Sequence, residues 1–260
     1  MELDSSQQAA QKQFDNRSAH YGDTHPLSNT TDVELSLENI ILTPEMTALD
    51  IATGGGHTGL FLARRGVQVT FSDISAEMLD KVDAALTKEG LKGELRQHTA
   101  EALPYGDGVF DLVTSRVAPH HFSDPQGFIH SAARVLKPGG HFLLIDIVSP
   151  DEESEAADWI NRVEKLRDPS HVRNYTRSEW MGWVVDAGLS ILFAELHPMQ
   201  QTDLERYFAV ADTSAENQAE VHSLIREASE KTRDIFQLGD EDGKIAWWWQ
   251  RLRLLARKAV

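Results

Sequence analysis

A glycine-rich turn between a strand-like run and a helix-like run constrains the fold of this chain more than any other feature. Residues 47–51 are mostly apolar, residues 53–59 read Thr-Gly-Gly-Gly-His-Thr-Gly, and residues 58–65 have helical character. Glycines suit such a turn because the backbone must bend sharply and a ligand must approach it closely. Unpaired N–H groups at a helix start suit the polar or anionic part of a ligand. The turn is therefore a candidate ligand loop, although three successive glycines also suit a plain flexible turn.

Strand-like and helix-like segments alternate from residue 47 to residue 148. We expect strands over 47–51, 67–72, 95–98, 109–115 and 141–148, helices over 58–65, 76–88 and 125–135, and a turn at 137–140. This alternation predicts an α/β fold with a mostly parallel sheet and helices on both faces. Ligands of such sheets bind beyond the carboxyl ends of the strands. The loops that follow Asp50, Asp73, His98 and Ser115 should therefore converge on one crevice.

The two ends of the chain differ from this central part. Residues 1–13 are polar and we expect them to fray, and residues 14–28 suit an irregular surface arm or, alternatively, a lid over a ligand. Residues 30–43 predict a helix that Pro44 ends. Beyond Pro150 we expect helices over 151–166, 178–187, 203–212 and 215–236, a strand-like segment over 189–196, a turn at 239–243 and a last strand within 244–259, where Trp247–Trp249 should serve packing.

Charge and composition exclude several classes of protein. The formal net charge is −16 at pH 7, whereas a protein that binds nucleic acid needs clustered Lys and Arg. The absence of cysteine rules out disulfides, zinc–thiolate sites and a cysteine nucleophile. No window approaches the length of a membrane-spanning helix, and residues 1–8 lack the features of a signal peptide. We therefore expect a cytoplasmic protein that acts on small molecules, without nucleic acid, a membrane span or a metal.

Asp73 ends the second predicted strand and lies about 20 residues beyond the glycine turn, a spacing that places an acid near ribose hydroxyls. A dinucleotide-binding fold and an S-adenosylmethionine-binding fold share this geometry. Gly54, Gly56 and Gly59 can be matched to the G-x-G-x-x-G pattern of the former, but a single match of this kind is weak evidence.

The neighbouring segments favour the second possibility, because five of them, in order, resemble motifs of the class I S-adenosylmethionine-dependent methyltransferases. The first is 50–56 (Asp-Ile-Ala-Thr-Gly-Gly-Gly) and the second is 72–79 (Ser-Asp-Ile-Ser-Ala-Glu-Met-Leu). The third is 100–105, the fourth is Phe110-Asp111, and the fifth is 134–140 (Arg-Val-Leu-Lys-Pro-Gly-Gly). The loop 52–57 and the segments 115–122 and 163–171 are similar to the ubiquinone/menaquinone-biosynthesis C-methyltransferase type, methyltransferase domain type 11, and its small-molecule relatives.

The resemblance implies a Rossmann-like, mostly parallel seven-stranded sheet with an antiparallel last strand. It also implies one domain over 1–260, with an N-terminal arm or lid (1–29), a cofactor-binding core (30–149), a helical cover and acceptor region (150–243) and a final strand (244–260). The cofactor is S-adenosyl-L-methionine and the product S-adenosyl-L-homocysteine. The implied cofactor-binding residues are Tyr21, Asp50, Ala52, Gly54, Gly56, Asp73, Ile74, Met78, Thr99, Ala100, Glu101 and Arg116.

These residues would divide the cofactor among them. Asp50 and the Gly54 and Gly56 backbone would hold the methionine part, with Arg116 closing that end and Tyr21 covering it. Asp73 would hold the ribose, Ile74 and Met78 would flank the adenine, and Thr99 to Glu101 would line its edge. Relatives often have Asp where this chain has Thr99, which puts the contact with the adenine amino group in doubt.

Methyl transfer requires an aligned acceptor, and a base where the acceptor is a hydroxyl or an acidic carbon. We predict His121 or His120 as that base, and His171 and Tyr175 as residues of the substrate pocket. The acceptor should be a small organic molecule, and the protein a monomer or homodimer. The alternatives are a nicotinamide-dependent oxidoreductase and a catalytically silent S-adenosylmethionine-binding protein.

Overall fold

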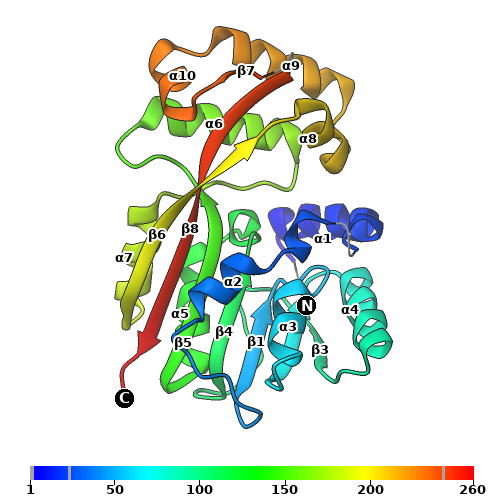
Figure 1. The fold of residues 1–260 in the computed structure, drawn as a ribbon, viewed down its shortest axis with the longest axis vertical. Coiled ribbons are helices and arrows are strands. Elements are labelled where there is room, and N and C mark those ends of the chain that lie inside the picture. Colours follow the sequence, from blue (N-terminus) through cyan, green and yellow to red (C-terminus); the bar gives the residue numbers. More distant parts are fainter. Residues whose placement is uncertain (1–2, 23–24, 242–243) are drawn as a thin grey trace.

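Seven strands form one sheet in the order β3-β2-β1-β4-β5-β8-β6 in the computed structural model, which describes residues 3–22, 25–241 and 244–260 (Figure 1). The first five strands of this order are parallel, whereas β8 is antiparallel to both β5 and β6. The strands are β1 (Thr47–Ile51), β2 (Gln68–Asp73), β3 (Glu94–Gln97), β4 (Phe110–Arg116), β5 (Leu136–Val148), β6 (Leu189–Gln201) and β8 (Lys244–Lys258), and β7 (Gly239–Glu241) pairs with β8 outside this order. The predicted mostly parallel seven-stranded sheet with an antiparallel last strand is confirmed.

Helices cover both faces of the sheet because the buried strands are apolar on both sides. On one face, α5 (Pro125–Val135) and α7 (Arg177–Asp186) pack with strand residues whose side chains lie on that face, among them Phe142 and Leu144. On the other face, α2 (Thr31–Ser36), α3 (His57–Ala63) and α4 (Ala76–Glu89) pack with Leu143, Ile145 and Phe71. Successive residues of β5 thus enter opposite cores, as the two-residue period of a strand requires.

The long strands β6 and β8 continue past the parallel strands into a second layer of helices, the cap (Figure 1). The cap consists of α6 (Ser154–Arg167), α8 (Leu204–Ala211), α9 (Ala215–Glu227) and α10 (Glu230–Phe236). Trp247 and Trp249 are buried there against Tyr207 and Trp159, with ring centroids 5.4 Å apart for Trp247 and Tyr207. These tryptophans serve packing, as predicted. Among the described residues, no helix is both long and apolar enough to cross a bilayer.

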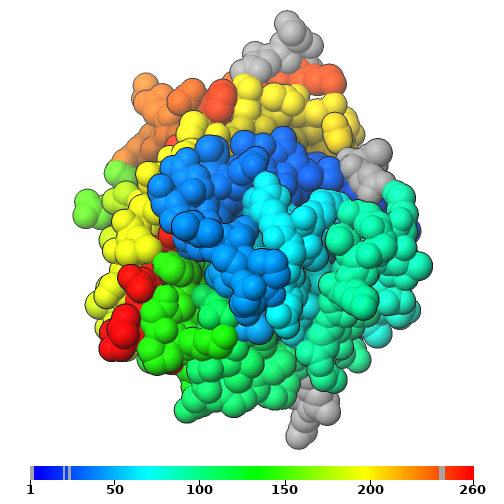
Figure 2. Space-filling model, turned by 60° about the horizontal axis from the view of Figure 1, so that its bottom comes forward, coloured from blue at the N-terminus to red at the C-terminus, as the bar shows by residue number. Residues whose placement is uncertain are grey.

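The N-terminus differs from the expected frayed segment, because α1 (Ser5–Arg17) is a helix of 13 residues. Asp4 accepts a hydrogen bond from the Gln7 backbone N–H, and the Gln7 side chain accepts one from the Asp4 N–H, so a capping box stabilises the helix start. Figure 2 shows the N-terminal segment, in blue, lying across the molecule between the core in cyan and the yellow segment near residue 200. The arm is therefore an ordered cover rather than a loose end.

Five further expectations differ from the structure. The helix expected over 30–43 is limited to α2, because Val33 and Leu37 enter the core whereas Ile41 is 86% exposed, so the apolar run has no common helical face. The turn expected at 137–140 lies inside β5 as a bulge, where the pairing with β4 shifts from Phe110↔Leu136 to Leu112↔His141.

The helix expected over 215–236 is two helices, α9 and α10, because the Ser229 side chain accepts the Thr232 N–H and caps a new helix start. Residues 239–241, expected as part of a turn, form β7, and residues 242–243 of that expected turn lie outside the described residues. The region 150–243 also contributes α7 and β6 to the sheet layer, so it is more than a helical cover.

Candidate active site

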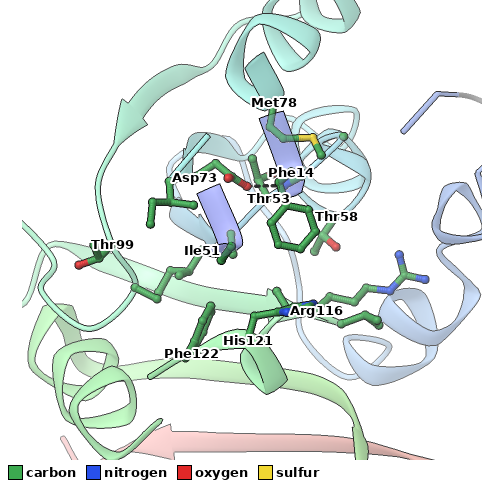
Figure 3. A pocket seen from close by; sticks show the side chains of 18 of the residues that line it. Phe14, Ile51, Thr53, Thr58, Asp73, Met78, Thr99, Arg116, His121 and Phe122 are labelled. Atoms are coloured by element: carbon green, nitrogen blue, oxygen red, sulfur yellow. Dashed lines mark hydrogen bonds between the residues drawn. The ribbon is translucent and has the colours of Figure 1, made fainter. Parts of the chain in front are cut away.

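One pocket lies at the carboxyl ends of β1, β2 and β4, where the predicted crevice should be (Figure 3). In Figure 3, Asp73 and Met78 lie on one side of the Phe14 ring and His121 and Phe122 on the other. The pocket is lined by Gln7, Ala10, Phe14, Tyr21, Leu27, Ile51, Ala52, Thr53, Gly54, Gly55, His57, Thr58, Asp73, Ile74, Met78, His98, Thr99, Ala100, Glu101, Arg116, Val117, Ala118, His121 and Phe122. It thus contains ten of the twelve cofactor-binding residues predicted from the sequence, all but Asp50 and Gly56.

The three glycines of the loop are required for two reasons, the backbone conformation and the close approach of the arm. Gly54 and Gly56 have positive φ angles of 53° and 82°, which glycine adopts without strain. A Cβ on Gly55 would lie 2.7 Å from the Tyr21 carbonyl oxygen, so only glycine lets the arm lie directly on the loop. Ala52 and Val117 also have positive φ, each 52°, and both line the pocket. Such conformations cost roughly 1–3 kcal/mol and are typical of functional sites.

Asp50 shapes this loop from beneath instead of lining the pocket. One of its carboxylate oxygens accepts hydrogen bonds from Thr53 Oγ1 at 2.5 Å and the Gly59 N–H at 3.0 Å, and the other accepts Thr114 Oγ1 at 2.7 Å. The side chain is buried, and burial raises its pKa against the opposing effect of these bonds. Asp50 thus does not line the pocket, and its oxygens hold the turn between β1 and α3; its role toward the methionine part of the cofactor stays a prediction.

Asp73 lines the pocket at the end of β2 and is 5% exposed. Its two carboxylate oxygens accept the backbone N–H groups of Gly54 and Ser75, each at 2.9 Å. Burial raises the pKa of Asp73 to about 6, although these bonds favour the ionised form. A carboxylate oxygen has two lone pairs, so each oxygen can accept one further hydrogen bond from a ligand.

Two predicted cofactor residues hold the N-terminal arm. The guanidinium of Arg116 donates to Asp32, at 3.0 Å from Nε, and to the backbone oxygens of Leu27 and Asn29, each at 2.7 Å. The carboxylate of Glu101 accepts the Gln7 side-chain amide at 3.0 Å and the Ser123 N–H at 3.1 Å. Both side chains line the pocket, but their charges are engaged with α1 and the segment that follows it.

The predicted catalytic pair divides into two environments. His121 lines the pocket, and its ring meets Phe14 edge-on at 5.0 Å. His120 does not line the pocket, and its Nδ1 pairs with Asp146 Oδ1 at 2.7 Å. Burial disfavours the charged form of His120, but the Asp146 carboxylate outweighs it and raises the His120 pKa. Of the two candidates, only His121 is placed to meet a ligand.

The predicted substrate-pocket residues lie elsewhere. His171 is fully buried and its Nε2 lies 3.1 Å from Asn161 Oδ1, and Tyr175 packs edge-on against Trp180 and Trp183 in the core beneath α7. Among the described residues, none from 150–241 lines the pocket. The pocket wall expected from that region is formed by α1 and residues 21 and 27 of the arm.

Sequence reasoning therefore anticipated a cover that includes Tyr21 but missed the contribution of α1. Gln7, Ala10 and Phe14 face the pocket because their spacing places them on one side of α1. The Asp4–Gln7 capping pair was the signal that could have indicated this helix.

Comparison with known proteins agrees with the geometry. Residues 49–144 match the methyltransferase domain family. An uncharacterized methyltransferase, YcgJ of Bacillus subtilis, is 30% identical over 86% of this chain and 88% of its own length. The crystal structure of a putative methyltransferase from Bacillus halodurans superposes with a TM-score of 0.83 at 29% identity, covering 88% of this chain and all of that one. A ubiquinone/menaquinone biosynthesis C-methyltransferase of Shewanella sediminis is 35% identical over 45% of this chain and 49% of its own length.

Proposed function

This chain belongs to the S-adenosylmethionine-dependent methyltransferase family, and we propose that its pocket binds S-adenosylmethionine for methyl transfer to a small organic acceptor. The observation that carries the proposal is the buried Asp73 carboxylate, which faces the pocket beside the glycine loop with one free acceptor position on each oxygen. Two neighbouring ribose hydroxyls are donors that match these positions.

The donor set of the pocket fits this cofactor better than a nicotinamide dinucleotide. Arg116 is the single Lys or Arg among the described lining residues, and it is already paired with Asp32, which it shares with Arg251. A pyrophosphate in this pocket would find no unpaired Lys or Arg side chain among the described lining residues to balance its charge. A nucleoside that carries a sulfonium group and an ammonium group avoids this repulsion.

The chain's own residues would bind and orient the ligand. Asp73 would accept the ribose hydroxyls, Ile74 and Met78 would flank the adenine, and Thr99 and Ala100 would line its edge. The backbone of Gly54, which lines the pocket, would meet the amino-acid part, and Gly56 would act through the shape of the loop. When bound, the cofactor supplies an activated methyl group, so alignment of the acceptor provides most of the protein's contribution.

The arm would exclude water and His121 would receive a proton. Phe14 and Tyr21 close the pocket above the glycine loop, which requires the arm to open for ligand exchange. The pocket side of His121 is the position from which a base can reach an acceptor. The net charge of −16 favours a neutral or cationic acceptor. The four-part division of the chain and a monomeric or dimeric state stay predictions.

Isothermal titration with S-adenosylhomocysteine and, separately, with NAD tests the proposal. We expect the former to bind and the latter not to bind. Absence of S-adenosylhomocysteine binding at millimolar concentration would refute the proposal. A methyl-release assay across a panel of small hydroxyl, enol and amine acceptors then separates an enzyme from a protein that only binds the cofactor.

A further inference from the structure

A buried chain of hydrogen bonds connects His121 to the N-terminal arm. His121 Nδ1 lies 3.1 Å from Ser170 Oγ, and Ser170 Oγ lies 2.5 Å from Asp168 Oδ1. The other oxygen of Asp168 pairs with Arg17 Nη1 of α1 at 3.2 Å. All four side chains are buried, although they come from three separate parts of the sequence.

The hydrogen-bonding capacity of these groups determines the direction of each bond. The Arg167 charge and the two hydrogen bonds from Ser170 lower the pKa of Asp168 against the effect of its burial, so its carboxylate only accepts. The single hydroxyl proton of Ser170 is therefore donated to Asp168, and the Ser170 N–H also donates to the same oxygen at 2.9 Å. Ser170 Oγ is left to accept, which requires that His121 carries its proton on Nδ1.

This arrangement leaves a lone pair on His121 Nε2. In the described part of the chain no hydrogen-bond partner is found for Nε2, and the ring forms part of the pocket wall. Burial and the neighbouring His120 lower the pKa of His121, so the ring is neutral near pH 7. The imidazole thus offers a proton acceptor to the pocket.

We propose that Ser170 and Asp168 are positioning residues that hold His121 as its Nδ1–H tautomer, so that Nε2 accepts the proton of a hydroxyl, enol or N–H on the methyl acceptor. The inference rests on the proposed function. As the acceptor atom forms its bond to the methyl group, the carbon–sulfur bond breaks with its electron pair on sulfur, and the acceptor's proton passes to Nε2. Because the acceptor becomes far more acidic as its new bond forms, a weak base suffices. Asp168 would stabilise the resulting imidazolium through Ser170.

Nitrogen NMR of the full chain with ¹⁵N-labelled histidine tests the tautomer without a methylation assay. Comparison with His121→Gln identifies the His121 signals. We expect a protonated Nδ1 and an unprotonated Nε2 at pH 7.5. Ser170→Ala should convert this single form into a mixture, whereas Ser170→Thr, which keeps a hydroxyl, should preserve it. Ser131→Ala is the matched control, because its hydroxyl bonds to the Glu101 carbonyl oxygen and not to a histidine.

A protonated Nε2 in the wild-type protein, or an unchanged His121 spectrum in a folded Ser170→Ala, would overturn the inference. S-adenosylhomocysteine titration of the same samples distinguishes this failure from failure of the proposed function. Ser170 does not line the pocket, so Ser170→Ala should bind S-adenosylhomocysteine within about twofold of wild type. If the wild-type protein binds S-adenosylhomocysteine but its His121 carries the proton on Nε2, only the positioning role is refuted. If the wild-type protein does not bind S-adenosylhomocysteine, the proposed function itself is refuted.

Discussion

Replacement of Asp73 by alanine should weaken the binding of S-adenosylhomocysteine. Each Asp73 oxygen already accepts one backbone N–H, so two acceptor positions remain for the two ribose hydroxyls. Loss of hydrogen bonds to a charged group typically costs about 1–3 kcal/mol, which corresponds to roughly 5- to 150-fold in the dissociation constant. Isothermal titration at pH 7.5 measures the change directly.

The control must separate ribose binding from loosening of the loop, because Asp73→Ala also leaves the Gly54 and Ser75 N–H groups without acceptors. Ser75 caps α4 through the Met78 N–H but does not line the pocket. Ser75→Ala should lower the free energy of unfolding by about 1 kcal/mol and leave the affinity unchanged. A folded Asp73→Ala protein with wild-type affinity would show that Asp73 does not bind the ribose.

Three further outcomes are expected. Affinity for S-adenosylhomocysteine should be greatest near pH 8 and decline as the pH falls through about 6 in titrations across pH 5–8, because Asp73, with its pKa raised to about 6, loses its accepting carboxylate form over that range; a pH profile unaltered in Asp73→Ala would contradict this. Arg17→Ala removes the ion-pair partner of the buried Asp168, which keeps only its Ser170 hydrogen bonds and the Arg167 charge, and should lower the free energy of unfolding by about 3 kcal/mol; an unshifted urea midpoint would argue against it. Gly59→Ala would place a Cβ 2.2 Å from the Phe71 ring and should destabilise by about 1–3 kcal/mol in thermal unfolding, whereas Gly182→Ala, in open space within a helix, should stabilise by up to about 1 kcal/mol; equal effects would refute the packing argument.

The strands of the sheet and the glycine loop could be predicted because their signals are local. Continuous apolar runs, such as 141–148, indicate strands buried on both faces, and Ser75 before residues 76–88 indicates a capped helix. Asp73 could be placed in the site because the carboxyl ends of adjacent parallel strands meet at one edge. The helix ends within 215–236 were harder to predict, because the apolar pattern continues through Ser229, where the capping side chain begins a new helix.

The roles of individual site residues depended on contacts between distant parts of the chain. Arg116 lines the pocket, but its guanidinium pairs with Asp32, 84 residues away, and no local pattern specifies that partner. His120 and His121 are neighbours in sequence, yet one pairs with Asp146 inside the core and the other faces the pocket. Their division follows from the short helix Pro119–His121, which directs successive side chains to different sides.

The amino-acid sequence by itself determined the sheet, the glycine loop and the family of this chain, because each is encoded by periodicity and by motifs within short segments. Only the tertiary structure decided what covers the loop and what supports its histidine. The cover is α1 together with Tyr21, whose backbone fits against Gly55 because that residue has no side chain. The support is Ser170 with Asp168, which lies 151 residues beyond its partner Arg17. Such pairings depend on where the folded sheet brings distant segments together, and the residues carry no local sign of them.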